Sequence, residues 1–208
     1  MSAPHDAIIL MARAPEPGRV KTRLAAEMGD EQALAIYREL AEGVAAALRK
    51  AGPRVTVSFT PTDAEPMMRD WLGDDFRYEP QGSGDVGARM ASAIASRFAA
   101  GADRVVVVGS DCPTMTPEAL RAAFSALADA DVVLGPAMDG GYYLVGVSAP
   151  QDALFHDVPW SSGNVLRVSL ERAREAGLRV TMLPEMRDID TAADWRAHRE
   201  AEWTRARD

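Results

Sequence analysis

The stretch Arg104-Val-Val-Val-Val-Gly-Ser-Asp-Cys-Pro113 decides the fold class, because four consecutive valines run into a short loop that carries a carboxylate. A continuous apolar run of this length predicts a strand that is buried on both faces of a sheet. Just before it, apolar residues recur at four-residue spacing, at Val86, Met90, Ile94 and Phe98. This spacing predicts a helix that leads into the central strand.

Strand and helix patterns alternate along the rest of the chain. We expect further strands at residues 7–11, 54–59, 131–134, 142–147 and 179–183. Further helices are expected around residues 36–48, 116–128, 164–176 and 191–203. The alternation predicts an α/β fold with three αβα layers and a Rossmann-like, mostly parallel (mixed) sheet. In such sheets, ligands bind at the carboxyl ends of the strands.

The composition is typical of a globular protein. The 208 residues, 47% of them hydrophobic and 26% charged, suit a single domain spanning residues 1–208. The net charge of −8 argues against nucleic acid as a partner. We expect neither a signal peptide nor a membrane span, because no segment has the required apolar length. The single cysteine, Cys112, fits a reducing compartment, so we predict a cytoplasmic protein.

A basic segment, Arg13-Ala-Pro-Glu-Pro-Gly-Arg-Val-Lys-Thr-Arg23, directly follows the first expected strand. Arginine offers forked donors and lysine a point charge, a combination that suits a polyphosphate. We therefore predict that Arg13, Lys21 and Arg23 bind nucleotide phosphates, and that Arg13 and Lys21 also stabilise charge during the reaction. The alternative is a solvated surface loop, which we favour for Arg19.

A glycine-rich segment, Gln81-Gly-Ser-Gly-Asp-Val-Gly87, matches the glycine spacing of the dinucleotide fingerprint, but a single match is weak. The segment follows a later strand, and apolar residues stand where the fingerprint requires an acidic one. We interpret Gly82, Gly84 and Gly87 as a nucleotide-binding turn that lets the backbone approach a base or ribose, with Arg89 beside it. A plain connection with an exposed Arg89 is an equal alternative.

Asp111, which follows the valine strand, is the best candidate for a metal ligand. Burying an unpaired carboxylate is costly, and the alternative role of helix cap is already filled by Thr116. Hard cations such as Mg²⁺ or Mn²⁺ prefer oxygen ligands of this kind. We interpret the adjacent Cys112 as a small packed residue.

Two further segments are candidates for binding an acceptor. Asp139 lies in a glycine-rich turn just before Tyr142 and Tyr143, so it could bind and activate an acceptor hydroxyl or serve only as a turn residue. Trp160 and Ser161 could belong to a loop that closes on a ligand, or Trp160 could simply pack.

The segment Arg187-Asp-Ile-Asp-Thr191 places two carboxylates just before the last expected helix. Alternate side chains of an extended segment point to opposite sides. We therefore expect one carboxylate to reach the site and the other to cap the helix or bind Arg187. Asp190 is the predicted metal ligand, and Asp188 is the alternative.

Together, four motifs resemble the nucleotide-diphospho-sugar transferase superfamily, whose fold is also called GT-A: Lys-Thr-Arg-Leu24, Ser-Asp-Cys-Pro113, Asp-Gly-Gly-Tyr142 and Asp-Ile-Asp-Thr191. The resemblance spans nearly the whole chain. It is closest to a bacterial glycosyltransferase-like family labelled as a domain of unknown function (DUF2064), which is related to the molybdenum-cofactor and phospholactate guanylyltransferases. The resemblance implies that Arg13 and Lys21 grip phosphates, that Asp111 and Asp190 hold the metal, and that residues 82–87 face the nucleoside.

These motifs predict a metal-dependent transferase that moves a nucleotidyl group from an NTP to a small phosphorylated or hydroxylated acceptor. A triphosphate in particular needs the counter-charge of the basic segment. Glycosyl transfer from a nucleotide-diphospho-sugar is the close alternative. An NAD-dependent oxidoreductase would rest on the glycine spacing alone, and a nucleotide-binding regulator without activity is the remaining alternative.

Overall fold

A mixed sheet of seven strands forms the centre of the computed structural model, which describes residues 5–160 and 162–205. The strand order is β3-β2-β1-β4-β6-β5-β7. β6 runs antiparallel to both of its neighbours, and the other neighbouring strands pair in parallel. The strands are β1 Asp6–Arg13, β2 Arg54–Thr60, β3 Arg77–Pro80, β4 Arg104–Val108, β5 Val132–Pro136, β6 Tyr142–Val147 and β7 Val180–Met182.

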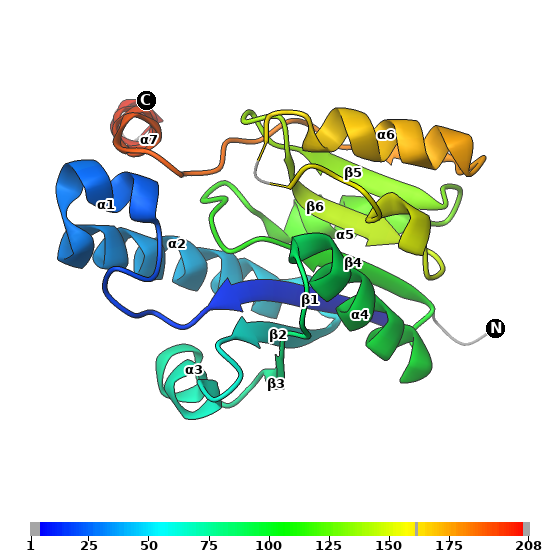
Figure 1. The fold of residues 1–208 in the computed structure, drawn as a ribbon, viewed down its shortest axis with the longest axis horizontal. Helices are drawn as coiled ribbons and strands as arrows, with labels where there is room; N and C mark the ends of the chain where they lie inside the picture. The colour runs from blue at the N-terminus through cyan, green and yellow to red at the C-terminus, as the bar shows by residue number, and fades with distance from the viewer. Residues whose placement is uncertain (1–4, 161, 206–208) are drawn as a thin grey trace.

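Helices cover both faces of the sheet and give the molecule three layers (Figure 1). Residues of α2, α3 and α5 join the core on one face, and residues of α4 and α6 join the core on the other. The described helices are α1 Thr22–Met28, α2 Asp30–Ala51, α3 Glu65–Leu72, α4 Val86–Ala99, α5 Pro117–Ala126, α6 Val165–Glu175 and α7 Ala192–Arg205, with a short 3₁₀ helix, η1, at Asp152–Leu154.

The first strand, β1, shows how an apolar run builds both faces of the sheet. Successive side chains of a strand point to opposite faces. Ile8 and Leu10 therefore join the core that includes α2, whereas Ala7 and Ile9 join the core that includes α4. A strand that is covered on both faces has to be apolar throughout, and the short apolar runs of the sequence mark such strands.

A smaller apolar cluster ties the last part of the chain to the first two helices. Leu24 of α1 and Leu40 of α2 pack in this cluster with Ile189 and Ala192. Figure 1 shows α7 beside α1, at one end of the molecule. The backbone N–H of Ile189 also donates to the carbonyl oxygen of Asp111 at 3.0 Å. This packing brings residues 187–191 to the carboxyl ends of β1 and β4.

The structure confirms the predicted three-layer α/β fold and each helix and strand that periodicity indicated. The sequence patterns did not predict α1, α3 and β3, which have seven, eight and four residues. Each of these elements buries only one or two residues, so none produces a periodic signal. None of the described helices has the length and apolar character needed to cross a membrane.

The packing of α2 on the sheet can be tested at Leu48, which is fully buried. We expect Leu48→Ala to lower the free energy of unfolding by roughly 2–5 kcal/mol, because the substitution leaves a cavity in the core. Lys50→Ala, at an exposed position of the same helix, should change it by less than about 0.5 kcal/mol. Urea denaturation measures both values. An equal change in the free energy of unfolding for the two variants would contradict the packing of Leu48 in the core.

Candidate functional site

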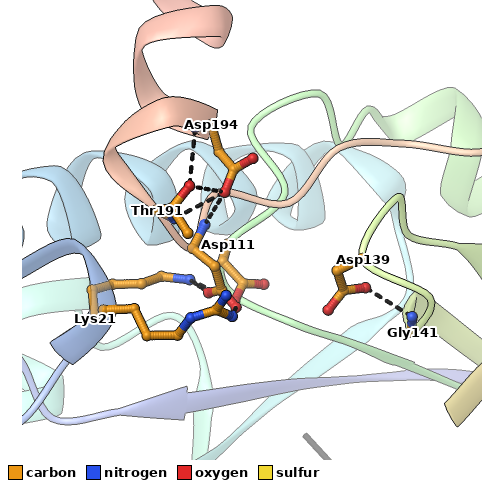
Figure 2. Close-up of polar contacts among 8 residues, drawn as sticks. Lys21, Asp111, Asp139, Gly141, Thr191 and Asp194 are labelled. Carbon is orange, nitrogen blue, oxygen red and sulfur yellow. Dashed lines mark hydrogen bonds and ion pairs between the residues drawn. The ribbon is translucent and has the colours of Figure 1, made fainter. Parts of the chain in front are cut away.

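Lys21 lies at the centre of the candidate site. Its Nζ is 2.8 Å from Oδ2 of Asp111 and 2.7 Å from Oδ1 of Asp190. Figure 2 shows the side chain of Lys21 extending towards Asp111. The Lys21 side chain is only 7% exposed, whereas those of Asp111 and Asp190 are 33% and 34% exposed. Three segments that are far apart in the sequence therefore meet at one ammonium group.

The backbone of Lys21 adopts the left-handed conformation, with φ 46° and ψ 48°, which non-glycine residues rarely adopt. Lys21 is the N-cap residue of α1, so the helix begins immediately after it. Burial lowers the pKa of Lys21, but the facing carboxylates of Asp111 and Asp190 raise it, and the pKa lies above its usual value. The ammonium group is therefore charged at neutral pH.

Tyr37 of α2 fixes the end of β1. Its hydroxyl donates to the carbonyl oxygen of Arg13 at 2.8 Å and accepts from the backbone N–H of Arg13 at 2.9 Å. The Arg13 guanidinium in turn donates to the carbonyl oxygen of Arg19 at 2.9 Å. The basic segment is thus anchored at its start, and this role of Tyr37 carried no signal in the sequence beyond an apolar helix position.

A cavity of about 430 Å³ opens at the carboxyl ends of β1, β2 and β4. Five basic side chains line it, and we call it the basic cavity: Arg13, Arg19, Lys21, Arg23 and Arg89. The strand order reverses between β1 and β4, and such a switch point is where ligands of α/β sheets bind. The structure thus brings the predicted phosphate-binding residues together, and it adds Arg19.

A second cavity, of about 850 Å³, adjoins the first, and we call it the acidic cavity. Among its lining residues are Asp139, Asp188, Tyr142 and Trp160. The two cavities share Met11, Arg23, Val86, Asp111 and Asp190. The predicted acceptor residues Asp139, Tyr142 and Trp160 therefore lie in a space that is continuous with the basic cavity. Ser161 lies outside the described residues.

Three carboxylates of the acidic cavity are close enough to hold a metal ion. Oxygen atoms of Asp139, Asp188 and Asp190 lie within 4.8 Å of one another. Burial and the facing carboxylates of Asp139, Asp111 and Asp190 raise the pKa of Asp188 to about 6. This excess of negative oxygen donors suits a hard divalent cation. Asp190 thus belongs both to this cluster and to the ion pairs of Lys21.

The expectation that only one of Asp188 and Asp190 would reach the site was wrong. Both carboxylates line the acidic cavity, and Ile189 between them is buried in the apolar cluster. Residues two apart in an extended segment share a side, which explains this arrangement. Arg187 pairs instead with Asp194, and Asp194 forms a capping box with Thr191 (Figure 2).

The glycine-rich segment lies at the start of α4. Its residues Gln81 and Val86, together with Arg89, line the basic cavity, whereas the described lining includes neither Gly82, Gly84 nor Gly87. A Cβ atom on Gly87 would lie 2.5 Å from Cζ2 of Trp160. The absence of a side chain at residue 87 therefore permits the close packing of Trp160 on α4.

The turn that carries Asp139 has a defined geometry. Oδ1 of Asp139 accepts a hydrogen bond of 2.7 Å from the backbone N–H of Gly141 (Figure 2). Gly140 has φ 88°, and a Cβ at this residue would lie 2.3 Å from the carbonyl oxygen of Gly163. Asp139 is therefore a turn residue that also faces the acidic cavity. Tyr143, which follows this turn in β6, is buried, and its hydroxyl donates to the carbonyl oxygen of Pro184 at 3.1 Å.

Comparison with known proteins identifies relatives of the chain. Residues 43–162 match the family described as "Uncharacterized protein conserved in bacteria (DUF2064)". The 2-phospho-L-lactate guanylyltransferase of Halobacterium salinarum is 31% identical over 86% of this chain and 78% of its own length. A "putative nucleotide-diphospho-sugar transferase" from Desulfovibrio desulfuricans G20 superimposes with a TM-score of 0.86 at 33% identity, over 91% of this chain and 84% of that one. A nucleotidyl transferase from Methanothermobacter thermautotroptrophicus shares the fold, with a TM-score of 0.64 at 18% identity, over 96% and 98% of the two chains.

The anchoring role of Tyr37 can be tested by removing its hydroxyl. We expect Tyr37→Phe to lower the free energy of unfolding by about 1–3 kcal/mol, because it leaves a backbone N–H and a carbonyl of Arg13 without their partner. Tyr78→Phe is the matched control, since among the described residues its buried hydroxyl bonds only the carbonyl of Gly73. Urea denaturation should show the larger loss for Tyr37→Phe. An equal or smaller loss would contradict the double hydrogen bond.

Proposed function

Because the chain belongs to the DUF2064 family of bacterial proteins, we propose that it transfers a nucleotidyl group from a nucleoside triphosphate to a small acceptor. The nucleotide occupies the basic cavity and the acceptor occupies the acidic cavity. One observation carries this proposal: five cations surround a cavity that opens onto a cluster of carboxylates, in a protein whose net charge is −8. Such a division of charge matches a polyphosphate donor beside a separate acceptor.

The relatives supply the donor that should be tested first. The Halobacterium protein is named as a guanylyltransferase, so GTP is the first candidate. The Desulfovibrio protein is named as a nucleotide-diphospho-sugar transferase, which supports glycosyl transfer as a second candidate function. The number of cations in the basic cavity favours the triphosphate, because a triphosphate carries more negative charge than a diphosphate-sugar.

In the proposed reaction, an acceptor oxygen forms a bond to the α-phosphorus of the triphosphate. The bond from this phosphorus to the pyrophosphate oxygen breaks, and pyrophosphate leaves with the electron pair. The proton of the acceptor hydroxyl passes to a carboxylate of the acidic cavity. Lys21, Arg13 and Arg23 bind the phosphates and stabilise the charge that develops on them, so no protein nucleophile is needed.

The carboxylates of the site fit a divalent cation, which we propose to be Mg²⁺ or Mn²⁺. Asp111 and Asp190 are the proposed ligands, and Asp188, which lies in the same carboxylate cluster as Asp190, is a further oxygen donor. A bound cation would withdraw charge from the phosphate oxygens. The lysine lies between Asp111 and Asp190, where its ammonium offsets part of their negative charge.

The two candidate functions differ in the product that leaves. We expect pyrophosphate to be released from a nucleoside triphosphate, GTP first, in the presence of Mg²⁺ or Mn²⁺ and a panel of hydroxylated and phosphorylated acceptors. Chelation of the metal should abolish the release. Release of a nucleoside diphosphate from a nucleotide-sugar, without pyrophosphate release from any triphosphate, would instead establish glycosyl transfer.

Lys21 should be essential for turnover. We expect Lys21→Met to lower the rate of pyrophosphate release by about 10²–10³-fold, because it removes a positive charge from the wall of the basic cavity and from between Asp111 and Asp190. Lys50→Met is the control at an exposed position outside both cavities, and it should retain the wild-type rate. Circular dichroism and urea denaturation establish that each variant is folded. A folded Lys21→Met protein with the wild-type rate would contradict the assignment.

A further inference from the structure

The acidic cavity is poor in positive charge. Arg23 is the only basic residue among its described lining residues. This side chain is 71% exposed, and its Nη1 already lies 3.6 Å from Oδ2 of Asp190. Four carboxylates line the same cavity, namely Asp111, Asp139, Asp188 and Asp190. A phosphate monoester, with a charge of about −1.5 to −2 at neutral pH, would lie among like charges there.

The surrounding cations do not offset these carboxylates. Lys21 already pairs with Asp111 and Asp190. Neither Asp139 nor Asp188 forms an ion pair with any cation of the described residues. One divalent cation, together with Lys21 and Arg23, would bring the four carboxylates to neutrality. It would leave no net positive charge for a phosphate on the acceptor.

An aromatic and aliphatic wall forms much of the rest of the acidic cavity. The rings of Trp160 and Tyr142 meet edge to face, with centroids 6.4 Å apart and planes at 86°. Val86 and Met90 extend this apolar wall. The indole Nε1 of Trp160 is buried, and it has no hydrogen-bond partner among the described residues. A Cβ at Gly87 would lie 2.7 Å from this nitrogen, so the N–H faces α4 and the ring presents its carbon atoms to the cavity.

We propose that the acceptor is an uncharged, polyhydroxylated molecule, a sugar or a polyol, rather than a phosphorylated acid. This inference rests on the proposed nucleotidyl transfer and specifies its acceptor. Ionised carboxylates only accept hydrogen bonds, so the acidic wall is complementary to hydroxyl donors. The aromatic wall provides a surface for the carbon skeleton. The acceptor thus differs in charge from the 2-phospho-L-lactate in the name of the Halobacterium relative.

Asp139 is the residue that takes the acceptor proton. Its Oδ1 is held by the backbone N–H of Gly141 at 2.7 Å, and Oδ2 has no hydrogen bond with the described residues. Oδ2 therefore accepts the hydroxyl of the acceptor. As the hydroxyl oxygen bonds to the α-phosphorus and pyrophosphate leaves, the proton passes to this carboxylate.

The experiment uses the full chain and matched pairs of acceptors: glycerol and glycerol 3-phosphate, glucose and glucose 6-phosphate, and ribose and ribose 5-phosphate, with 2-phospho-L-lactate added. Binding of GTP, and then of the other nucleoside triphosphates, is measured first by calorimetry in the presence of Mn²⁺. If no nucleotide binds, the proposed function itself is rejected. Binding of each acceptor is then measured by ligand-observed NMR, and turnover by pyrophosphate release. We expect the uncharged member of at least one pair to bind and react at least about tenfold better, since juxtaposed like charges cost several kcal/mol.

Preference for the phosphorylated members or for 2-phospho-L-lactate overturns the inference, and so does binding of no uncharged member. Asp139→Asn supplies a second test, because its amide oxygen can keep the bond to Gly141. It should slow turnover and reduce the preference for uncharged acceptors in the NMR binding assay by about tenfold. Asp152→Asn, the same change at an exposed position outside the cavity, should leave the preference unchanged. An unchanged preference in Asp139→Asn also overturns the inference.

Discussion

The ion pairs of Lys21 are the constraint on which the rest of the site depends. A buried ammonium is costly unless carboxylates face it, and Lys21 is 7% exposed between Asp111 and Asp190. These residues come from the loop after β1, the loop after β4 and the segment before α7. Their meeting requires the packing of Ile189 and Ala192 against α1 and α2. The apolar cluster at the end of the molecule therefore holds Asp190 within reach of Lys21.

The sheet topology explains why two cavities of opposite charge can share a wall. Strands β1, β2 and β3 lie on one side of the switch point, and their carboxyl ends supply the basic segment, Thr60 and Gln81. On the other side, β6 runs antiparallel to β4 and places the Asp139 turn at the same edge. Asp111 follows β4 and lies on the boundary. Only an antiparallel pair allows so short a turn between β5 and β6, because parallel neighbours need a long crossover connection.

The sequence predicts the fold and most of the residues that line the two cavities, because both depend on local patterns. Apolar runs mark the buried strands. The basic segment and Asp111 directly follow β1 and β4, and the parallel pairing of these strands brings both to one edge. Tyr37 could not be predicted, since its hydroxyl bonds Arg13 across a tertiary contact and its helix position is simply apolar. We did not predict that Asp188 and Asp190 both face the acidic cavity. The two-residue period of an extended segment does predict it, because residues i and i+2 point to the same side.

Trp160 and Gly87 connect the two halves of the site. The indole lies so close to α4 that any side chain at residue 87 would displace it, with Cζ2 only 2.5 Å from a Cβ at this residue. Val86, in the same turn of α4, lines both cavities, and Arg89 lines the basic cavity. The aromatic wall of the acidic cavity thus rests on the helix that borders the basic cavity. Gly87 itself is not among the described lining residues of the basic cavity, so its contribution to the site is the close packing of Trp160 on α4.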